Sequence, residues 1–239
     1  MLLHAVVLVS NLIPTPLTPV AADSCIRDPT EVRIYAKIDP PTTDFTKNEA
    51  QLKALKPDGA IAGDPRFTQI TGLTVAGIEV DSEVRIANSR FSDGNVCAWP
   101  SVVTITLSTS PKVYVTADHS KCQTDAGLTH EMTHVAIDRA IIDRYTPIFR
   151  HRMSTMVEAI GTVGPVPESA LSTIRHRIEE KINAAIAVAT DQLTTDRTAE
   201  QRGLDSPTEY ERLANVCPQI QLNPGSRLSR PEPKPTAVR

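Results

Sequence analysis

A change of periodicity at Cys122 is the feature that most constrains the fold of this chain. Between Thr68 and Asp118, short runs rich in Val, Ile and Thr are separated by turn residues, a pattern typical of β-strands. From Cys122 to about Glu200, apolar residues instead recur at the spacing of α-helices. The change predicts an α+β protein in which an N-terminal antiparallel sheet precedes a helical C-terminal half.

Most of the predicted strands follow one another closely and should form an antiparallel meander, because short turns such as that at residues 92–94 connect them. The first strand stands apart and ends before Pro40, since proline cannot donate to a strand ladder. Thr46 and Glu49 form a capping-box pattern for a short helix at residues 50–55. The predicted strands are Glu31 to Ile38, Ile70 to Val80, Glu83 to Phe91, Val96 to Leu107 and Lys112 to Ala117.

Two long helices are predicted in the C-terminal half, at about residues 125–160 and 168–202. Glycines and prolines in the segment 161–167 require a turn between them. The two helices should therefore pack antiparallel, with residues whose numbers sum to about 328 lying level. A third, shorter helix is expected to begin with Ser206 as N-cap and Glu209 at the third helical position.

The charge of the chain is nearly balanced. Its 239 residues include 25 Lys and Arg against 28 Asp and Glu, and the isoelectric point is near 6.1. Nonspecific nucleic-acid binding and attachment to an anionic membrane surface both need a broad positive field, so neither is expected.

The N-terminal 22 residues contain no charged side chain, and their apolar run is too short to span a bilayer. They are typical of a signal peptide, with cleavage ahead of Asp23. The expected organisation is a signal peptide at 1–22, one folded domain at 23–217 and a proline-rich, disordered tail at 218–239. This organisation predicts a secreted or periplasmic protein without a membrane span.

All four cysteines lie beyond the expected cleavage site, and their even number predicts two disulfides formed in an oxidising compartment. Three connectivities are possible. We favour Cys97 with Cys122, which would close the strand region, and Cys25 with Cys217, which would tie the mature N-terminus to the end of the helical region.

An H-E-x-x-H motif, formed by His130, Glu131 and His134, lies within the first predicted long helix. Residues four apart share one face of a helix, so His130 and His134 can both bind one zinc ion. Glu131 lies one step round the helix, where it can accept a proton from a water molecule activated by the zinc. The motif therefore predicts a mononuclear zinc site with Glu131 as general base.

The segment from His130 to Asp138 resembles the active helix of thermolysin-type zincin metallopeptidases. The order of strands, cysteines and helices is remotely similar to a family of predicted secreted zinc-dependent proteases, loosely over residues 30–215. The resemblance implies a zincin-like peptidase domain in which the last strand before the helix, Lys112 to Ala117, lines the substrate cleft. No Gly-x-x-His follows His134, so the metzincin pattern is absent and the third ligand must come from elsewhere.

Two candidates for the third zinc ligand lie on the same predicted helix as the motif. Asp138 lies about 6 Å beyond His134 along the helix axis, too far for its short side chain to reach the metal, so it is expected to be an outer partner or a surface ion pair. Glu158 begins a Glu-Ala-Ile segment that echoes the ligand segment of thermolysin-like enzymes. It faces away from the apolar stripe unless Pro147 breaks the helix.

Two further candidates lie on the second long helix. Asp196 and Glu200 continue its apolar stripe and lie level with the motif in the antiparallel pairing. Buried carboxylates need a partner, which zinc would supply. We expect Glu200 to be the third ligand because its longer side chain leans back toward the histidines, with Asp196 as an outer partner or alternative ligand.

The sequence thus favours a secreted or periplasmic zinc metallopeptidase that hydrolyses peptide or other amide bonds, with His130, His134 and Glu200 holding the zinc. The alternative is a noncatalytic envelope or binding protein in which the same helix pair is structural and retains a metal. An open fourth coordination position favours the enzyme, whereas a site sealed by side chains favours the binding protein. Nothing in the sequence identifies the substrate or the oligomeric state.

Overall fold

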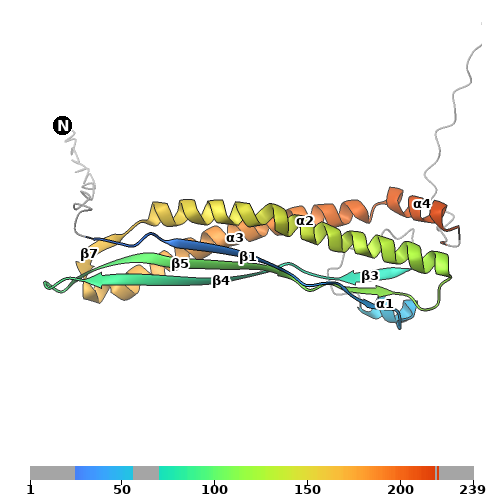
Figure 1. The fold of residues 1–239 in the computed structure, drawn as a ribbon, viewed down its shortest axis with the longest axis horizontal. Coiled ribbons are helices and arrows are strands. Elements are labelled where there is room, and N and C mark those ends of the chain that lie inside the picture. The colour runs from blue at the N-terminus through green and yellow to red at the C-terminus, as the bar shows by residue number, and fades with distance from the viewer. Residues whose placement is uncertain (1–24, 56–69, 219, 221–239) are drawn as a thin grey trace, which may run out of the picture.

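The computed structural model describes residues 25–55, 70–218 and 220 (Figure 1). The predicted signal peptide and nearly all of the predicted tail lie outside the described residues. The described part is elongated and mixed α+β, with two long helices running along one side of the longest strands (Figure 1). No helix in this part of the chain is both long and apolar enough to cross a membrane.

The larger sheet has the order β1-β5-β4, and β7 also pairs with β5. Its strands are β1 (Glu31–Ile38), β4 (Glu79–Arg90), β5 (Asn95–Thr109) and β7 (Val163–Pro167). The predicted first strand is confirmed, but the prediction of a purely antiparallel sheet is wrong because β1 is parallel to β5. A hairpin would have fixed an antiparallel direction, whereas two strands of a second, smaller sheet and a helix lie between β1 and β4 in the sequence.

The smaller sheet has the order β2-β6-β3 and consists of β2 (Thr42–Asp44), β3 (Gly72–Val75) and β6 (Lys112–Val115). Helix α1 (Glu49–Leu55) lies between β2 and β3 in the sequence. The helix is capped by Asn48 and Gln51, whose side chains accept hydrogen bonds from each other's backbone N–H groups. The predicted capping pair Thr46 and Glu49 is wrong, because Thr46 binds Asp44 and Glu49 pairs with Lys53.

Three α-helices make up most of the C-terminal half: α2 (Lys121–Ile160), α3 (Leu171–Leu204) and α4 (Pro207–Val216). The Ser120 side chain caps α2, and Pro147 lies inside α2 without ending it. The predicted start of α4 is confirmed, since the Ser206 hydroxyl accepts a hydrogen bond from the backbone N–H of Glu209. The segment between α2 and α3 forms β7 and a short 3-10 turn, Glu168–Ala170, rather than a tight turn alone.

The main core lies between the larger sheet and the two long helices. Strand β5 contributes alternate residues to it, as expected for a strand with one covered face. Helix α3 contributes an apolar stripe at helical spacing. Its large buried side chains include Ile105 and Leu107 of β5, Ile141, Tyr145 and Phe149 of α2, and Ile178, Ile182 and Leu193 of α3.

The structure contains two disulfides, as predicted, but the predicted pairing of the cysteines is wrong. Cys25 pairs with Cys97, and Cys122 pairs with Cys217. Because Glu31 of β1 lies beside Val102 of the parallel strand β5, the residue at 25 lies near the start of β5, which contains Cys97. The end of α4 packs against the first turn of α2, which brings Cys217 to Cys122.

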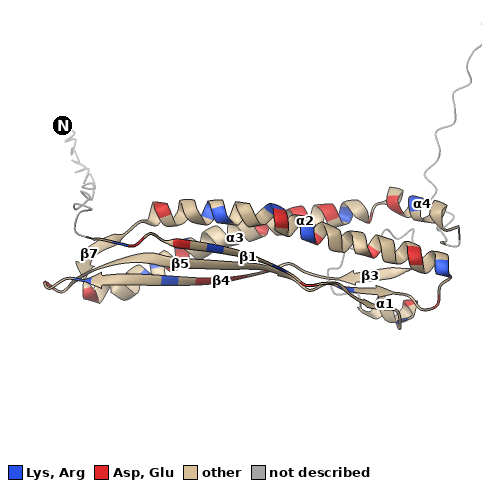
Figure 2. Ribbon diagram, viewed as in Figure 1, with Lys and Arg blue, Asp and Glu red and all other residues tan. Residues whose placement is uncertain are grey.

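Charged residues of both signs alternate along α2 and α3 (Figure 2). Neither helix presents a continuous run of one sign in this view (Figure 2). This distribution agrees with the nearly balanced composition of the chain.

Candidate metal centre

The three residues of the H-E-x-x-H motif are buried on α2, near the smaller sheet. His130, Glu131 and His134 are only 4%, 6% and 9% exposed. The two imidazole rings lie side by side with centroids 4.9 Å apart, as residues four apart on one helix should. The helix therefore presents both rings toward one point, as the sequence predicts.

A carboxylate from the connection between α3 and α4 lies between the two rings. The Oδ1 atom of Asp205 is 3.1 Å from Nε2 of His130 and 3.1 Å from Nε2 of His134. Side-chain donor atoms of all three residues lie within 4.8 Å of one another, so this group could hold a metal ion. Asp205 follows the last residue of α3 and precedes Ser206, the cap of α4, so two helix ends fix its position.

Gln201 of α3 determines which ring nitrogen of neutral His134 carries the proton. The Gln201 amide nitrogen donates to the carbonyl oxygen of His134 and to Oδ1 of Asp138, at 3.2 and 2.7 Å. The amide oxygen must therefore face Nδ1 of His134, which donates to it. Since Nδ1 carries the proton, Nε2 of neutral His134 presents its lone pair to Asp205.

His130 has a carboxylate on its outer side as well. Its Nδ1 atom lies 3.5 Å from Oε1 of Glu209 in the first turn of α4, which favours a proton on that nitrogen. Glu209 also binds Arg212 at 2.6 Å. The ring of Tyr210 lies 5.7 Å from the His130 ring, and its hydroxyl is 3.5 Å from Asp205. Helix α4 therefore covers the His130 side of the site.

A buried ion pair supports Gln201 from behind. Asp138 is fully buried and accepts two hydrogen bonds from Arg197 of α3, at 2.7 and 3.0 Å. Arg197 also donates to the carbonyl oxygen of Ala76, in the loop that follows β3. Asp138 is thus an outer partner, one of the two roles expected for it, and links His134 to α3 and to the smaller sheet.

Glu131 lies against the edge of the smaller sheet. A Cβ atom on Gly72 of β3 would come within 2.6 Å of the Glu131 Cγ atom, so glycine leaves the space that this side chain occupies. The neighbouring Thr74 hydroxyl donates to the Glu131 backbone carbonyl at 3.1 Å. Burial raises the pKa of Glu131 above its ordinary value, although the nearby histidines lower it in part.

The charges of the site favour an ionised Asp205. Burial raises the pKa of Asp205, but the hydrogen bonds that His130 and His134 donate when Nε2 carries a proton outweigh burial and leave this pKa well below the ordinary range. Burial lowers the pKa of His134, and the hydrogen bond and negative charge of Asp205 raise it by more. The Asp205 carboxylate therefore attracts positive charge to the point between the two rings.

The structure does not bring the predicted third ligands to the histidines. Glu200 binds Arg144 at 2.7 Å with 36% of its side chain exposed. Asp196 accepts a hydrogen bond from the Tyr145 hydroxyl at 2.7 Å. Glu158 is exposed, about 36 Å beyond His134 along an unbroken α2. The carboxylate beside the histidines is Asp205, which the sequence reasoning missed.

The reason for this miss is the relation between the two long helices. The predicted pairing would put residue 194 level with His134, but the residue in contact with His134 is Gln201, about two helical turns later. Strand β7 and the 3-10 turn lengthen the connection and shift α3 along α2. A usable signal was present, because Gln201 continues the buried spacing of Ile186 and Leu193 and the cap at Ser206 places a break between two helices at Asp205.

The strand beside Glu131 also differs from the expected one. The last strand before the helix, β6, is the central strand of the smaller sheet, so it offers no free edge there. The strand in contact with Glu131 is β3. Within the described residues, β3 pairs only with β6, which leaves its other edge without a strand partner.

Comparisons with protein-family models, with curated proteins and with solved structures found no match to this chain.

Proposed function

We propose that the chain is a secreted or periplasmic zinc-dependent hydrolase of peptide or other amide bonds. One observation carries the proposal: Nε2 of His130, Nε2 of His134 and Oδ1 of Asp205 converge on one point. With Gln201 holding a proton on Nδ1 of His134, the neutral histidines and Asp205 present acceptor atoms to one another there, and a cation between them would bind to them. A metal ion satisfies all three at once.

The donor set fits zinc. Two imidazole nitrogens and one carboxylate oxygen are a ligand combination used by catalytic zinc sites, which leave a fourth position for water or substrate. The partners on the outer nitrogens, Gln201 and Glu209, match the way proteins orient metal-binding histidines. When bound, zinc supplies Lewis acidity that activates water at neutral pH and polarises a carbonyl group.

Within the proposal, Glu131 is the general base. Glu131 follows His130 directly in the sequence, its carboxylate is packed against Gly72, and burial raises its pKa above the ordinary value. It would accept the proton of the attacking water and pass it to the leaving amine. The two disulfides are compatible with an oxidising compartment, which supports the secreted or periplasmic location.

Burial of the site favours a second candidate function. The side chains of His130 and His134 are only 5% and 11% exposed, and that of Asp205 is 19% exposed. A centre closed in this way is typical of structural metal sites, so a noncatalytic binding protein with a retained metal is the alternative.

The direct test of the proposed function is metal analysis of the purified mature chain combined with an assay on a broad quenched-peptide library. We expect one zinc per chain, cleavage that stops when the metal is removed by a chelator, and recovery when zinc is restored. His134→Ala, measured beside the wild type, should lack both zinc and cleavage. Full zinc occupancy without cleavage of any peptide would favour the noncatalytic alternative, and no zinc binding would reject both.

The packing of Glu131 against β3 gives a second prediction. Gly72→Ala should leave zinc content unchanged and lower turnover by about 10²-fold, because the new methyl group displaces the Glu131 side chain by a fraction of its length. Gly77→Ala is the matched control, since a Cβ atom there meets nothing within 4 Å. Equal turnover of the two folded variants would show that the position of Glu131 does not limit hydrolysis.

A further inference from the structure

Helix α4 carries two residues of the metal centre but has little packing of its own. It is 10 residues long, and Leu213 is its only buried residue. Isolated helices of this length are marginal in water, so the position of α4 depends on its contacts with the rest of the molecule. What holds α4 therefore also holds Glu209 and Tyr210 beside His130.

The non-covalent contact between α4 and α2 is small. An apolar cluster joins the two helices through Ala126, Leu213 and Cys217. Both helices also line an open surface pocket of about 500 Å³, and Ala126 and Leu213 are part of its lining, together with Arg212. Apolar surface that faces an open pocket stays in contact with solvent, so it contributes less to holding α4 on α2 than fully buried surface would.

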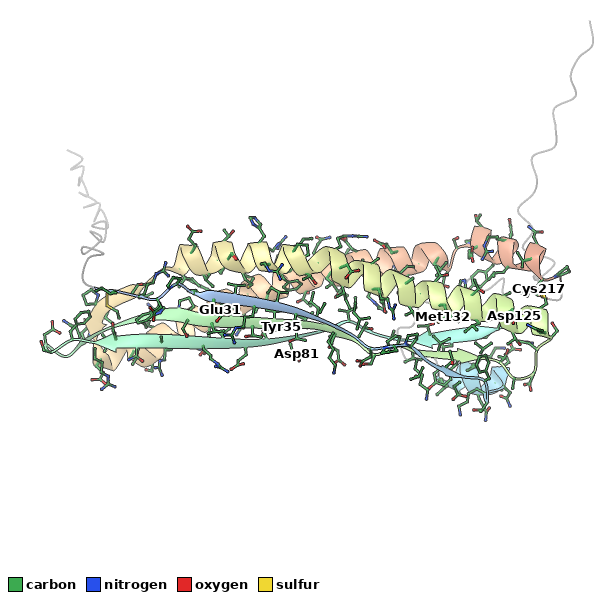
Figure 3. The ribbon with its side chains drawn as sticks, in the orientation of Figure 1. Glu31, Tyr35, Asp81, Asp125, Met132 and Cys217 are labelled. Carbon is green, nitrogen blue, oxygen red and sulfur yellow. A yellow bond between two sulfur atoms is a disulfide. The ribbon has the colours of Figure 1, made fainter. Side chains whose placement is uncertain are left out.

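A covalent link crosses the same interface. The disulfide joins Cys122, in the first turn of α2, to Cys217, the residue that caps α4. Figure 3 shows Cys217 near Asp125, which lines the same pocket, at one end of the molecule. The other disulfide, Cys25–Cys97, joins the N-terminal segment to β5 rather than α2 to α4.

The geometry points to a two-point attachment of α4 on α2. The interval from 122 to 130 along α2 equals the interval from 209 to 217 along α4, about 12 Å at 1.5 Å per residue. Cys122–Cys217 closes one end of this interval, and His130–Glu209 closes the other. Because helices are stiff over two turns, fixing one end restricts the other.

We propose that the Cys122–Cys217 disulfide is a positioning cross-link for the metal centre, which holds Glu209 against His130 and thereby raises the affinity for the metal. This inference rests on the proposed function, because it requires that His130, His134 and Asp205 bind zinc. Linkage requires in return that bound zinc stabilise the closed arrangement. Because a reductant reaches a disulfide more readily when the surrounding structure opens locally, zinc should also slow reduction of this disulfide.

The first test compares two cysteine pairs in the full-length mature chain. Zinc dissociation constants are measured by chelator competition for the Cys122→Ala/Cys217→Ala variant and for the Cys25→Ala/Cys97→Ala variant, with thermal unfolding to establish that each is folded. We expect the first variant to bind zinc about 10- to 100-fold more weakly than wild type, the cost typical of losing an outer partner of a ligand. The second variant removes a cross-link of similar span and should bind zinc like wild type.

A double-mutant cycle separates positioning from a general loss of stability. Glu209→Ala should weaken zinc binding in the wild-type background but add almost nothing to the Cys122→Ala/Cys217→Ala variant, because both changes remove the same contact with His130. Strictly additive effects, or equal zinc affinity of the two cysteine variants, would overturn the inference while leaving the proposed function intact. Absence of zinc binding by the wild type would instead overturn the proposed function, and the inference with it.

The reciprocal effect is measured by reduction with a phosphine. The phosphorus supplies two electrons to the disulfide and takes oxygen from water as phosphine oxide, and the two protons of that water go to the thiols of Cys122 and Cys217. We expect added zinc to slow this reduction about tenfold or more and to leave reduction of Cys25–Cys97 unchanged. Equal protection of both disulfides would contradict a specific link to the metal centre.

Discussion

Replacement of Asp205 by alanine should abolish zinc binding, with a loss of affinity beyond the roughly 10- to 100-fold cost of removing an outer partner. The reason is geometric, since its Oδ1 atom is 3.1 Å from both histidine Nε2 atoms and completes the donor set. Chelator competition on the purified variant measures the loss. Asp205→Asn, which keeps the shape of the side chain and removes its charge, should also bind zinc more weakly than wild type.

Glu200→Ala is the matched control for this prediction. Glu200 lies in the last turns of α3, shortly before Asp205, but forms a partly exposed ion pair with Arg144. Its removal should therefore change stability by at most about 1 kcal/mol and leave zinc affinity unchanged. Loss of the metal by Glu200→Ala, together with its retention by Asp205→Ala, would contradict the placement of Asp205 rather than Glu200 beside the two histidines.

Glu131→Gln should retain zinc and lose about 10²- to 10⁴-fold in turnover, because an amide of the same size cannot accept a proton from water. The loss should appear in kcat rather than in zinc content. Peptide cleavage and metal analysis on the same preparation measure both quantities. Glu158→Gln makes the same chemical change on the exposed part of α2 and should behave like wild type. A Glu131→Gln variant with wild-type turnover would remove the peptidase proposal and leave the noncatalytic alternative.

The elements that local sequence specifies were predictable. Strand β1 has the predicted bounds, and α4 begins at its predicted cap, Ser206. Both features depend on residues close together in the chain. Strand β1 follows from alternating residues that end at a proline. The start of α4 follows from a serine hydroxyl that accepts a hydrogen bond from the backbone N–H three residues later, in the first turn of the helix. The shared face of His130 and His134 follows in the same way from helix geometry alone.

Features that depend on distant segments were not predictable from the same patterns. The parallel direction of β1 on β5, and with it the Cys25–Cys97 pair, depends on segments inserted between these strands. The Cys122–Cys217 pair depends on how α4 packs on α2. Local alternation of residues is the same for parallel and antiparallel strands of this kind, so it could not distinguish the two.

The sequence by itself determined the α+β class, the long motif helix and the placing of two histidines and a glutamate on one side of it. Only the tertiary structure decided which carboxylate stands beside the histidines. A shift of α3 by about two turns moves Glu200 to Arg144 and brings Asp205, Gln201 and Glu209 to the site. The physical reason is that the sequence spacing within one helix defines the face on which a residue lies. Which residue of a neighbouring helix it meets depends on the connection between the helices and on core packing across the whole molecule.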